Sequence, residues 1–452
     1  IINKSRLMGT VSAVTFVLSA SLLNAETITK TFSLTADTGP FSGTTGSGAF
    51  TYDDANIFQD SISSDLALQQ DGSHTGSMVV ELSADPERFP WELFLPAIQH
   101  GSTAVEPRAV TLNTTLTSPG GLAFLPDARM LVTQKEGSMV ILSADGRDML
   151  AVVSGLPSVL AVGQGGLLDV ALDPDFDSDP WVYWTYAEAG TGDETGLAGT
   201  AVARGRLIEN TLQDVNIIYR QVPKVTGNGH YGSRLAFNVD KTLFVTLGER
   251  QKGSPAQDLA TTLGKVIRVN RDGTIPADNP VIPGARPEIW SYGHRNPQGA
   301  AIRQGSNALW LHEHGPQGGD EINHVEAGGN YGWPLVSYGC NYGDPIGEAC
   351  QIGGGTHAPT YIEPVSYWVP TSIAPAGMIF YSGTAFPQWQ GDIFMGALAG
   401  KSLWRVKLEG NTEVERESLF PELGERVRDV EQGPDGWIYL LTDSGKLVQI
   451  RN

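Results

Sequence analysis

Short apolar strands recur in pairs along the second part of the chain, and each pair is joined by a turn rich in Gly, Pro or Asp. The strands either alternate apolar and polar positions or run fully apolar, as strands covered on both faces do. A unit of this size cannot bury its own faces, so the units must pack against one another. The pairs begin near Gly121, Leu167, Arg234, Gly299, Gly377 and Asp429. The pattern predicts an all-β fold, a six-bladed β-propeller, with an array of two-sheet sandwiches as the alternative.

The first 108 residues follow a different pattern. Lys4 and Arg6 precede an apolar run over residues 11–23, and the small Ala25 follows it. This order is typical of a secretory signal peptide, and the run is too short to span a membrane. Thr, Ser, Gly and Asp then dominate, with stretches that alternate as strands do. We therefore expect a signal peptide over residues 1–25, a small β-rich N-terminal extension of unknown function over residues 26–108, and the propeller over residues 109–452.

The composition narrows the range of partners. The 452 residues carry a formal net charge of −20, and such a charge repels nucleic acid and anionic membranes. We expect an exported protein, periplasmic or extracellular, with a small-molecule partner, no nucleic acid and no membrane span. Cys340 and Cys350 are the two cysteines. In an oxidising compartment they predict a local disulfide, with two free thiols as the alternative.

Polar residues gather in the loops that flank the repeated strand pairs, and a propeller assembles its ligand site from loops at one end of its axis. Gln164 and His230 each lie in a glycine-rich loop that allows close approach of a ligand. Arg295 and Asn296 offer a cationic fork and an amide for a carboxylate or a quinone oxygen. A structural histidine and a buried structural arginine are the alternatives.

A pair of arginines precedes the last strand pair. Arg426 and Arg428 lie two residues apart, so on a strand they point to the same face. In so acidic a protein this pair predicts a local anion site, with a surface salt-bridge pair as the alternative.

One loop combines two histidines with several oxygen donors. His312 and His314 without a further Cys or His are weak evidence for zinc. Asp320, Glu321 and Asn323, together with the carbonyls of a Gly-Pro turn, are instead typical of calcium ligands. A solvated acidic turn is the alternative.

Taken together, these segments resemble the soluble aldose sugar dehydrogenases that use pyrroloquinoline quinone (PQQ), relatives of soluble glucose dehydrogenase. The resemblance runs from about Leu112 to the C-terminus. It rests on the motifs GQGGLLDVALDPDF, GSRLAF, LGKVIRVNRDGTIPADNP, EIWSYGHRNPQG, GGDEINHVEAGGNYGWP and RVRDVEQGPDGWIYLLTD, in this order.

The resemblance implies a six-bladed propeller that binds PQQ and calcium, and it implies roles for individual residues. His230 matches the base that takes the proton of the sugar C1 hydroxyl. The positions that match cofactor-binding residues are Gln164, Arg295, Asn296, Tyr342, Arg426 and Arg428, together with the segment Ala397, Leu398, Ala399 and Lys401. Gly315 and Pro316 match the turn whose carbonyls ligate the cofactor's calcium. Glu321 and the carbonyl of Tyr331 match a second, structural calcium site.

Two positions depart from the family pattern. The family often has a cofactor-binding lysine directly after Ala-Leu in the fifth repeat, where this chain has Ala399. Either Lys401 reaches the cofactor from two residues further on or the contact is lost, and we expect weaker cofactor binding. Glu249 stands where glucose-specific relatives carry Asp, so a strict preference for glucose does not transfer.

These residues predict an oxidoreductase that converts aldoses to lactones and passes electrons to an external acceptor, a quinone or a cytochrome. A neutral histidine suits the base, and calcium suits polarisation of a quinone carbonyl. Two alternatives remain at this stage: a calcium-dependent propeller lactonase, which is a hydrolase, and a non-enzymatic sugar-binding propeller.

Overall fold

The computed structural model describes residues 14–21, 27–36, 45–53 and 106–452. The chain divides into two compact units, Ile1–Glu106 and Pro107–Asn452. In the first unit, β1 (Val14–Ser21), β2 (Thr27–Ala36) and β3 (Thr45–Asp53) form an antiparallel sheet in that order. Strands β2 and β3 lie within the expected β-rich extension. Strand β1 lies within residues 1–25, and the signal peptide expected there stays a prediction.

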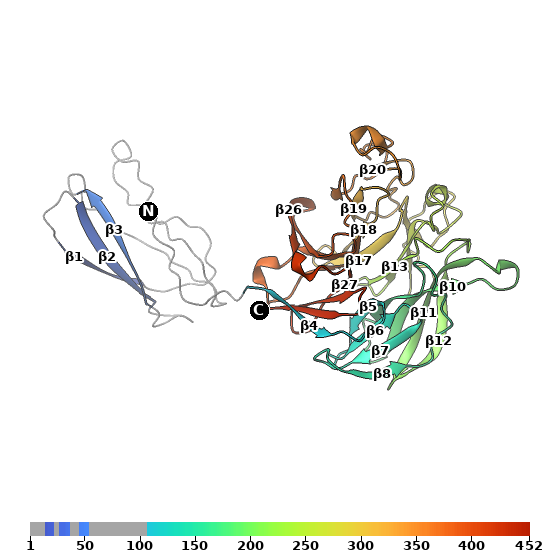
Figure 1. Ribbon diagram of the computed structural model, residues 1–452, viewed down its shortest axis with the longest axis horizontal. Coiled ribbons are helices and arrows are strands. Elements are labelled where there is room, and N and C mark those ends of the chain that lie inside the picture. Colours follow the sequence, from blue (N-terminus) through green and yellow to red (C-terminus); the bar gives the residue numbers. More distant parts are fainter. Residues whose placement is uncertain (1–13, 22–26, 37–44, 54–105) are drawn as a thin grey trace. The chain divides into compact units, whose positions relative to one another are not determined.

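The second unit contains six four-stranded antiparallel sheets, which confirms the six-bladed propeller (Figure 1). Blade 1 contains β5 (Pro119–Phe124), β6 (Met130–Gln134), β7 (Ser138–Leu142) and β8 (Met149–Val153), and blade 2 contains β9 (Leu167–Leu172), β10 (Trp181–Ala189), β11 (Ala198–Ile208) and β12 (Thr211–Arg220). Blade 3 contains β13 (Gly232–Phe237), β14 (Leu243–Leu247), β15 (Lys265–Val269) and β16 (Ile289–Tyr292), and blade 4 contains β17 (Pro297–Arg303), β18 (Ala308–Glu313), β19 (Asp320–His324) and β22 (Ser366–Trp368). Blade 5 contains β23 (Pro375–Phe380), β24 (Ile393–Ala397), β25 (Leu403–Glu409) and β26 (Thr412–Leu419). Blade 6 contains β27 (Val427–Gln432), β28 (Ile438–Thr442), β29 (Leu447–Arg451) and β4 (Arg108–Asn113).

The propeller closes by pairing the start of this unit with the end of the chain. Strand β4 is the outer strand of blade 6, where Ala109 pairs with Ile450 and Arg108 pairs with Arg451. The first strands of the blades contact one another in a ring, from β5 through β9, β13, β17 and β23 to β27 and back to β5. Each repeated strand pair of the sequence therefore forms the two inner strands of one blade.

Apolar side chains fill each interface between neighbouring blades. Trp184 of blade 2 packs in one cluster with Ile141 of blade 1, and Trp310 of blade 4 packs in another with Met395 of blade 5. The other four blade interfaces hold similar clusters. Because each blade is covered on both faces, its strands are nearly all apolar inside, as the sequence pattern indicates.

The antiparallel order of strands places two kinds of loop at one end of the axis. These are the loop that enters the first strand of each blade and the loop between its second and third strands. Short 3-10 turns lie in the connections at Gly192–Glu194, Ser254–Gln257, Glu348–Cys350, Pro387–Trp389 and Pro421–Leu423. No helix in the described part of the chain is long and apolar enough to span a membrane.

Blade 4 carries an insertion between β19 and β22. It contains a small ribbon of β20 (Ser337–Cys340) and β21 (Gln351–Ile352). A disulfide joins Cys340 and Cys350 across ten residues, which confirms the predicted local disulfide.

Candidate active site

A polar cavity of about 450 Å³ opens among the loops at one end of the axis. All six blades contribute to its wall. The lining includes Pro119 and Lys135 from blade 1, Gln164 and Asp169 from blade 2, Gly232 and Arg234 from blade 3, Asn296 and His314 from blade 4, Leu398 from blade 5, and Arg426, Arg428 and Asp443 from blade 6. Five of the expected cofactor-binding residues, Gln164, Asn296, Leu398, Arg426 and Arg428, are therefore together in one cavity.

His230 is not itself in the wall of this cavity, but it directly precedes Tyr231 and Gly232, which line it. Its backbone has φ +49°, a left-handed conformation that a histidine adopts only when its surroundings hold it there. Its backbone N–H donates to Gln164 Oε1 at 2.7 Å, and its Nδ1 lies 2.6 Å from Glu249 Oε1. Within residues 106–452 no group hydrogen-bonds to Nε2, so this nitrogen is free to serve as an acceptor.

Burial lowers the pKa of His230 below its usual value of 6.5, because the charged imidazolium would be poorly solvated. The hydrogen bond to Glu249 opposes this shift and the positive charge of Arg295 adds to it. The imidazole is therefore neutral at pH 7. With Nδ1 donating to a carboxylate, the lone pair is on Nε2, the form a general base requires.

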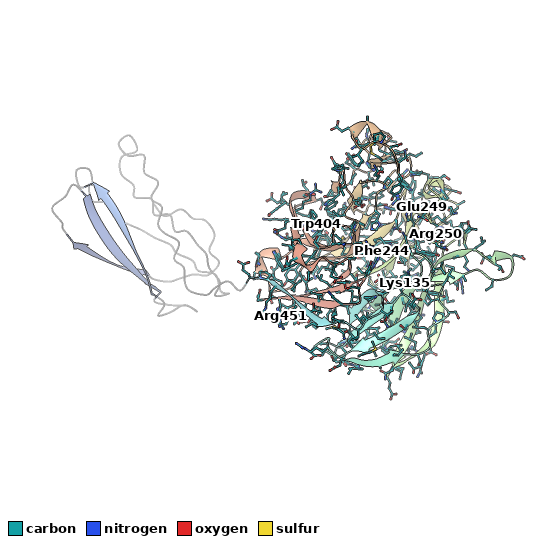
Figure 2. The ribbon with its side chains drawn as sticks, in the orientation of Figure 1. Lys135, Phe244, Glu249, Arg250, Trp404 and Arg451 are labelled. Carbon is teal, nitrogen blue, oxygen red and sulfur yellow. A yellow bond between two sulfur atoms is a disulfide. The ribbon has the colours of Figure 1, made fainter. Side chains whose placement is uncertain are left out.

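Glu249, labelled next to Arg250 in Figure 2, is buried. Its Oε2 accepts the backbone N–H groups of Lys252 and Gly253, the second at 2.8 Å. Burial raises the pKa of Glu249, but these hydrogen bonds and the one from His230 outweigh it, and the pKa falls below its usual range. Glu249 is thus an ionised carboxylate that orients the histidine.

Arg250 fixes the loop that carries His230. Its buried guanidinium donates to the carbonyls of Gly229 at 2.9 Å, Ala198 at 2.7 Å and Gly227, and it stacks on the Tyr231 ring at 3.7 Å. Because the Arg250 side chain hydrogen-bonds both to the first residue of β11 and to the loop before β13, it fixes the position of His230 relative to blade 2.

Arg295 and Asn296 precede β17 and are both buried. The Arg295 guanidinium donates to the His314 carbonyl at 3.1 Å and lies 3.5 Å from the Tyr342 hydroxyl. Its Nε is buried without a hydrogen-bond partner among the described residues. A buried unsatisfied donor is costly, so this position is prepared for an acceptor supplied by a ligand. Tyr342 itself is 72% exposed.

Arg426 and Arg428 share one carboxylate. Asp443 accepts from Arg426 Nε at 2.8 Å and from Arg428 Nε at 2.8 Å, and Arg426 also donates to the Leu398 carbonyl at 3.1 Å. Two guanidiniums opposite one carboxylate leave net positive charge at the cavity wall. The predicted same-face geometry is therefore present, and Asp443 is a partner that the sequence reasoning missed.

The four residues expected to bind the cofactor at the end of β24 and just after it differ in burial. Ala397 and Leu398 are buried, whereas Ala399 and Lys401 are exposed. The backbone N–H groups of Leu398 and Ala399 donate to Ala374 and Ile373. Of these four residues only Leu398 lines the cavity, and Lys401 is absent from its wall.

A small void of about 10 Å³, the size of one water or one ion, lies beside the cavity. Three of the four expected calcium-site residues line this void: Gly315, Glu321 and Tyr331. The fourth, Pro316, is buried and directly follows Gly315 in the sequence. Burial raises the pKa of Glu321, and Asn323 Oδ1 is buried without a partner among the described residues. Glu321 and the neighbouring backbone carbonyls are oxygen donors of the kind that calcium binds, and a cation would offset the cost of burying Glu321. Arg295 and His357 line the same void, and His357 Nε2 lies 3.3 Å from Glu321 Oε1.

The two histidines and Asp320 have structural roles. His312 Nε2 bonds to the Gly377 carbonyl at 2.9 Å and His314 Nε2 to the Pro375 carbonyl at 2.7 Å. Burial lowers the pKa of His312 to about 3 and that of His314 to about 4. Asp320 accepts the N–H groups of Gly315 at 3.0 Å and of residues 373 and 374. In residues 106–452 no group of three or more His, Cys, Asp or Glu side chains is placed to hold a metal, and the expected calcium ligands are mostly carbonyls.

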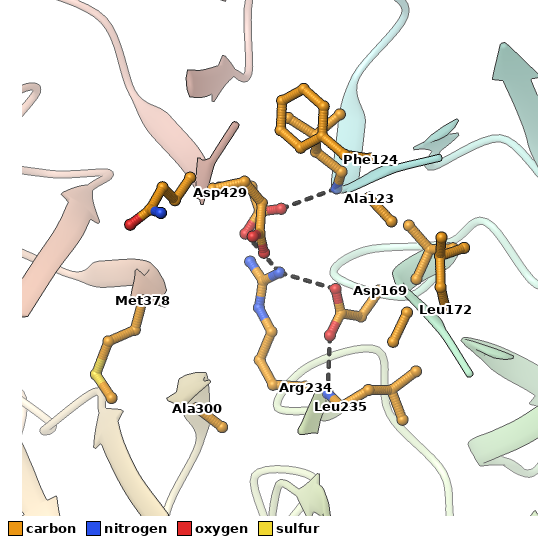
Figure 3. A pocket seen from close by; sticks show the side chains of 14 residues that line it. Ala123, Phe124, Asp169, Leu172, Arg234, Leu235, Ala300, Met378 and Asp429 are labelled. Carbon is orange, nitrogen blue, oxygen red and sulfur yellow. Dashed lines mark hydrogen bonds and ion pairs between the residues drawn. The ribbon is translucent and has the colours of Figure 1, made fainter. Parts of the chain in front are cut away.

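A second cavity, of about 290 Å³, lies further along the axis. Arg234 and Asp169 line both cavities. Figure 3 shows the Arg234 guanidinium between the carboxylates of Asp169 and Asp429, at 3.1 and 2.7 Å. Burial raises the pKa of Asp429 to about 6 despite the arginine. This buried network is the floor of the first cavity.

Sequence reasoning missed the residues that hold the expected ones in place. Lys135, Glu313 and Asp443 directly follow or end the second strand of their blades. The Glu313 carboxylate accepts from His294 Nδ1 at 2.8 Å and from the Arg295 N–H at 2.5 Å. The position after the second strand of each repeat is the signal that could have found them, because it always lies at the ligand end of the axis.

The propeller part of the chain is similar in sequence to known proteins. The sequence model of the glucose/sorbosone dehydrogenase family matches residues 116–449. Aldose sugar dehydrogenase YliI of Escherichia coli (strain K12) is 46% identical over 344 residues, covering 74% of this chain and 90% of that protein. Quinoprotein glucose dehydrogenase B of Acinetobacter calcoaceticus is 27% identical over 410 residues, covering 74% and 85%.

Solved structures give the same result. The soluble aldose sugar dehydrogenase of E. coli in its apo form superimposes with a TM-score of 0.71 at 43% identity, covering 76% of this chain and 99% of that one. The PQQ-bound aldose sugar dehydrogenase of Streptomyces coelicolor gives 0.64 at 28% identity, covering 76% and 98%.

The family match and the relatives of this six-bladed propeller define the protein as an oxidoreductase of the dehydrogenase class. The chain belongs to the glucose/sorbosone dehydrogenase family.

Proposed function

We propose that this protein oxidises the C1 hydroxyl of aldose sugars to lactones, with PQQ and calcium as cofactors and an external quinone or cytochrome as electron acceptor. The observation that carries the proposal is the Gln164–His230–Glu249 arrangement, in which Gln164 lines the cationic cavity and accepts the His230 backbone N–H. The relatives described as aldose sugar dehydrogenases support the substrate class. The protein is proposed to be exported, to the periplasm or out of the cell.

The residues present fit a quinone that carries several carboxylates. Arg295 has an unsatisfied buried Nε, and Arg426 and Arg428 share one carboxylate between two positive charges. Asn296 and Gln164 add neutral hydrogen-bonding groups to the same wall. The PQQ-bound relative supports this cofactor. When bound, the quinone supplies a hydride acceptor, which no amino-acid side chain can be.

His230 performs the proton transfer. Its neutral Nε2 accepts the proton of the sugar hydroxyl, so that the oxygen can form a carbonyl as the C–H bond breaks. Glu249 stabilises the imidazolium that forms, and Gln164 keeps the histidine backbone in place. Because the pKa of His230 is lowered, the base is ready at neutral pH.

Calcium would be held by the carbonyls of Gly315 and Pro316 near the cofactor and by Glu321 and the Tyr331 carbonyl at a second position. Around the small void, the Glu321 carboxylate and the neighbouring backbone carbonyls are a donor set suited to calcium, and a bound cation would favour the ionised form of Glu321 against the effect of burial. Asp320 contributes indirectly, because it fixes the Gly315 backbone.

The test is reduction of a dye by aldoses. Purified protein without cofactor is incubated with PQQ and calcium, and a panel of aldoses is added. Turnover that needs a sugar, the quinone and calcium together supports the proposal. A propeller lactonase instead opens lactones without dye reduction, and a sugar-binding propeller does neither.

A further inference from the structure

Lys135 lines the cavity and, in the part of the chain that the structure describes, is the cation of its wall with no carboxylate partner. The other Lys and Arg side chains of the wall are paired: Arg234 with Asp169 and Asp429, and Arg426 and Arg428 with Asp443. Within residues 106–452, no carboxylate forms an ion pair with Lys135. Its positive charge is therefore available to a ligand.

Lys135 directly follows the second strand of its blade, and the residue at this position in three other blades also lines the cavity. It is the first residue after β6, as His314 follows β18, Leu398 follows β24 and Asp443 follows β28. All four of these residues line the cavity. Around the axis, blade 1 lies between blade 6, which provides Arg428, and blade 2, which provides Gln164. Blade 1 is also the blade to which the sequence analysis assigned no site residue.

The backbone and stem of Lys135 are fixed. Its N–H donates to the Ser118 carbonyl and its carbonyl accepts from the Leu167 N–H, both at 3.0 Å. Its Cγ lies 2.5 Å from where a Cβ on Gly166 would be, so only glycine at 166 leaves room for the stem. These contacts bind the lysine to the entry of β9, while its ammonium remains unpaired.

We propose that Lys135 binds a carboxylate of the quinone cofactor, next to Arg428, and supplies the positive charge that Ala399 does not. The inference rests on the proposed function. It assigns the role to a different loop from that of Lys401, which is exposed and absent from the cavity wall.

The experiment titrates the full-length protein without cofactor with PQQ in the presence of calcium and follows quenching of tryptophan fluorescence. The variants are Lys135→Gln, Lys135→Arg and Lys401→Gln, with the exposed Lys407→Gln on β25 as the matched control. We expect Lys135→Gln to raise Kd about tenfold, which is about 1.4 kcal/mol. Lys135→Arg retains the charge and should stay within about threefold.

Ionic strength separates a charge effect from a loss of shape. The difference between wild type and Lys135→Gln should be largest near 0.01 M salt and nearly vanish near 1 M, where the Debye length is about 3 Å. Equal PQQ affinity of Lys135→Gln and wild type, or a loss confined to Lys401→Gln, overturns the inference and leaves the proposed function standing. No PQQ binding by wild type overturns both.

Discussion

Replacing Glu249 by glutamine tests how the histidine is oriented. Glu249 Oε2 accepts two backbone N–H groups and Oε1 faces His230 Nδ1. A glutamine oxygen would keep the two backbone donors, so its NH2 group would face Nδ1. The Nδ1 must then accept, the proton moves to Nε2, and His230 can no longer act as a base.

The size of the effect follows from this geometry. A general base contributes about 10²- to 10⁴-fold, so we expect Glu249→Gln to lose about that much in kcat/KM. Glu249→Ala removes the charged hydrogen bond, worth about 1.5–3 kcal/mol, without forcing the wrong tautomer. We therefore expect a smaller loss, about ten- to hundredfold.

The assay is sugar-dependent dye reduction by protein loaded with PQQ and calcium, measured from acid to neutral pH. Protonation of His230 removes the base, so activity falls as pH drops through its pKa, and the acid limb should lie below pH 6.5. Because Glu249 raises this pKa, Glu249→Ala should move the limb to lower pH. Cofactor binding and thermal unfolding of both variants serve as controls. Activity of Glu249→Gln within about twofold of wild type would show that Glu249 does not set the tautomer of His230.

Three further outcomes are expected. Arg250→Met leaves the loop carbonyls of Gly227 and Gly229 without a donor among the described residues and removes a second donor from the Ala198 carbonyl. It should lower the free energy of unfolding by about 3 kcal/mol, measured in urea; no change would mean that these hydrogen bonds are unimportant for stability. Replacing Cys340 and Cys350 by alanine opens a loop of ten residues and should lower the free energy of unfolding by about 3 kcal/mol in non-reducing conditions. In the presence of a reductant that opens the wild-type disulfide, the two proteins should be equally stable. Adding calcium to protein stripped of metal by a chelator should raise Tm, because calcium at a hundred times its Kd adds about 2.7 kcal/mol to the free energy of unfolding. An unchanged Tm would speak against the proposed calcium sites.

The sequence was enough to predict the fold because each strand pair carries its own hydrophobic pattern. The six pairs that begin near Gly121 through Asp429 are the inner strands of the six blades. The outer strands were harder to see, since β12 and β26 expose alternate or most positions. The pairing of β4 with β29 joins residues more than three hundred positions apart, and no local pattern encodes it.

The site was predictable where a motif places a residue in a loop next to an inner strand. Gln164, Asn296, Arg426 and Arg428 were found in this way and lie around one cavity. The partner residues Glu313 and Asp443 were missed, although each lies across the inner hairpin of the same blade, where Pro297 pairs with Glu313 and Val427 pairs with Thr442. Their partnership depends on side-chain geometry that the strand pattern does not give. Lys401 illustrates the limit: proximity in sequence to Ala399 suggested a contact, but its exposed position is outside the cavity wall.

His230 is proposed here as the base of a PQQ-dependent sugar oxidation. Wild type and His230→Ala are compared in sugar-dependent dye reduction after loading with PQQ and calcium, with PQQ affinity measured for both. We expect similar PQQ binding and a loss of turnover of about 10²-fold or more in His230→Ala. Equal turnover of the two proteins, or no sugar-dependent reduction by wild type with bound quinone, would contradict it.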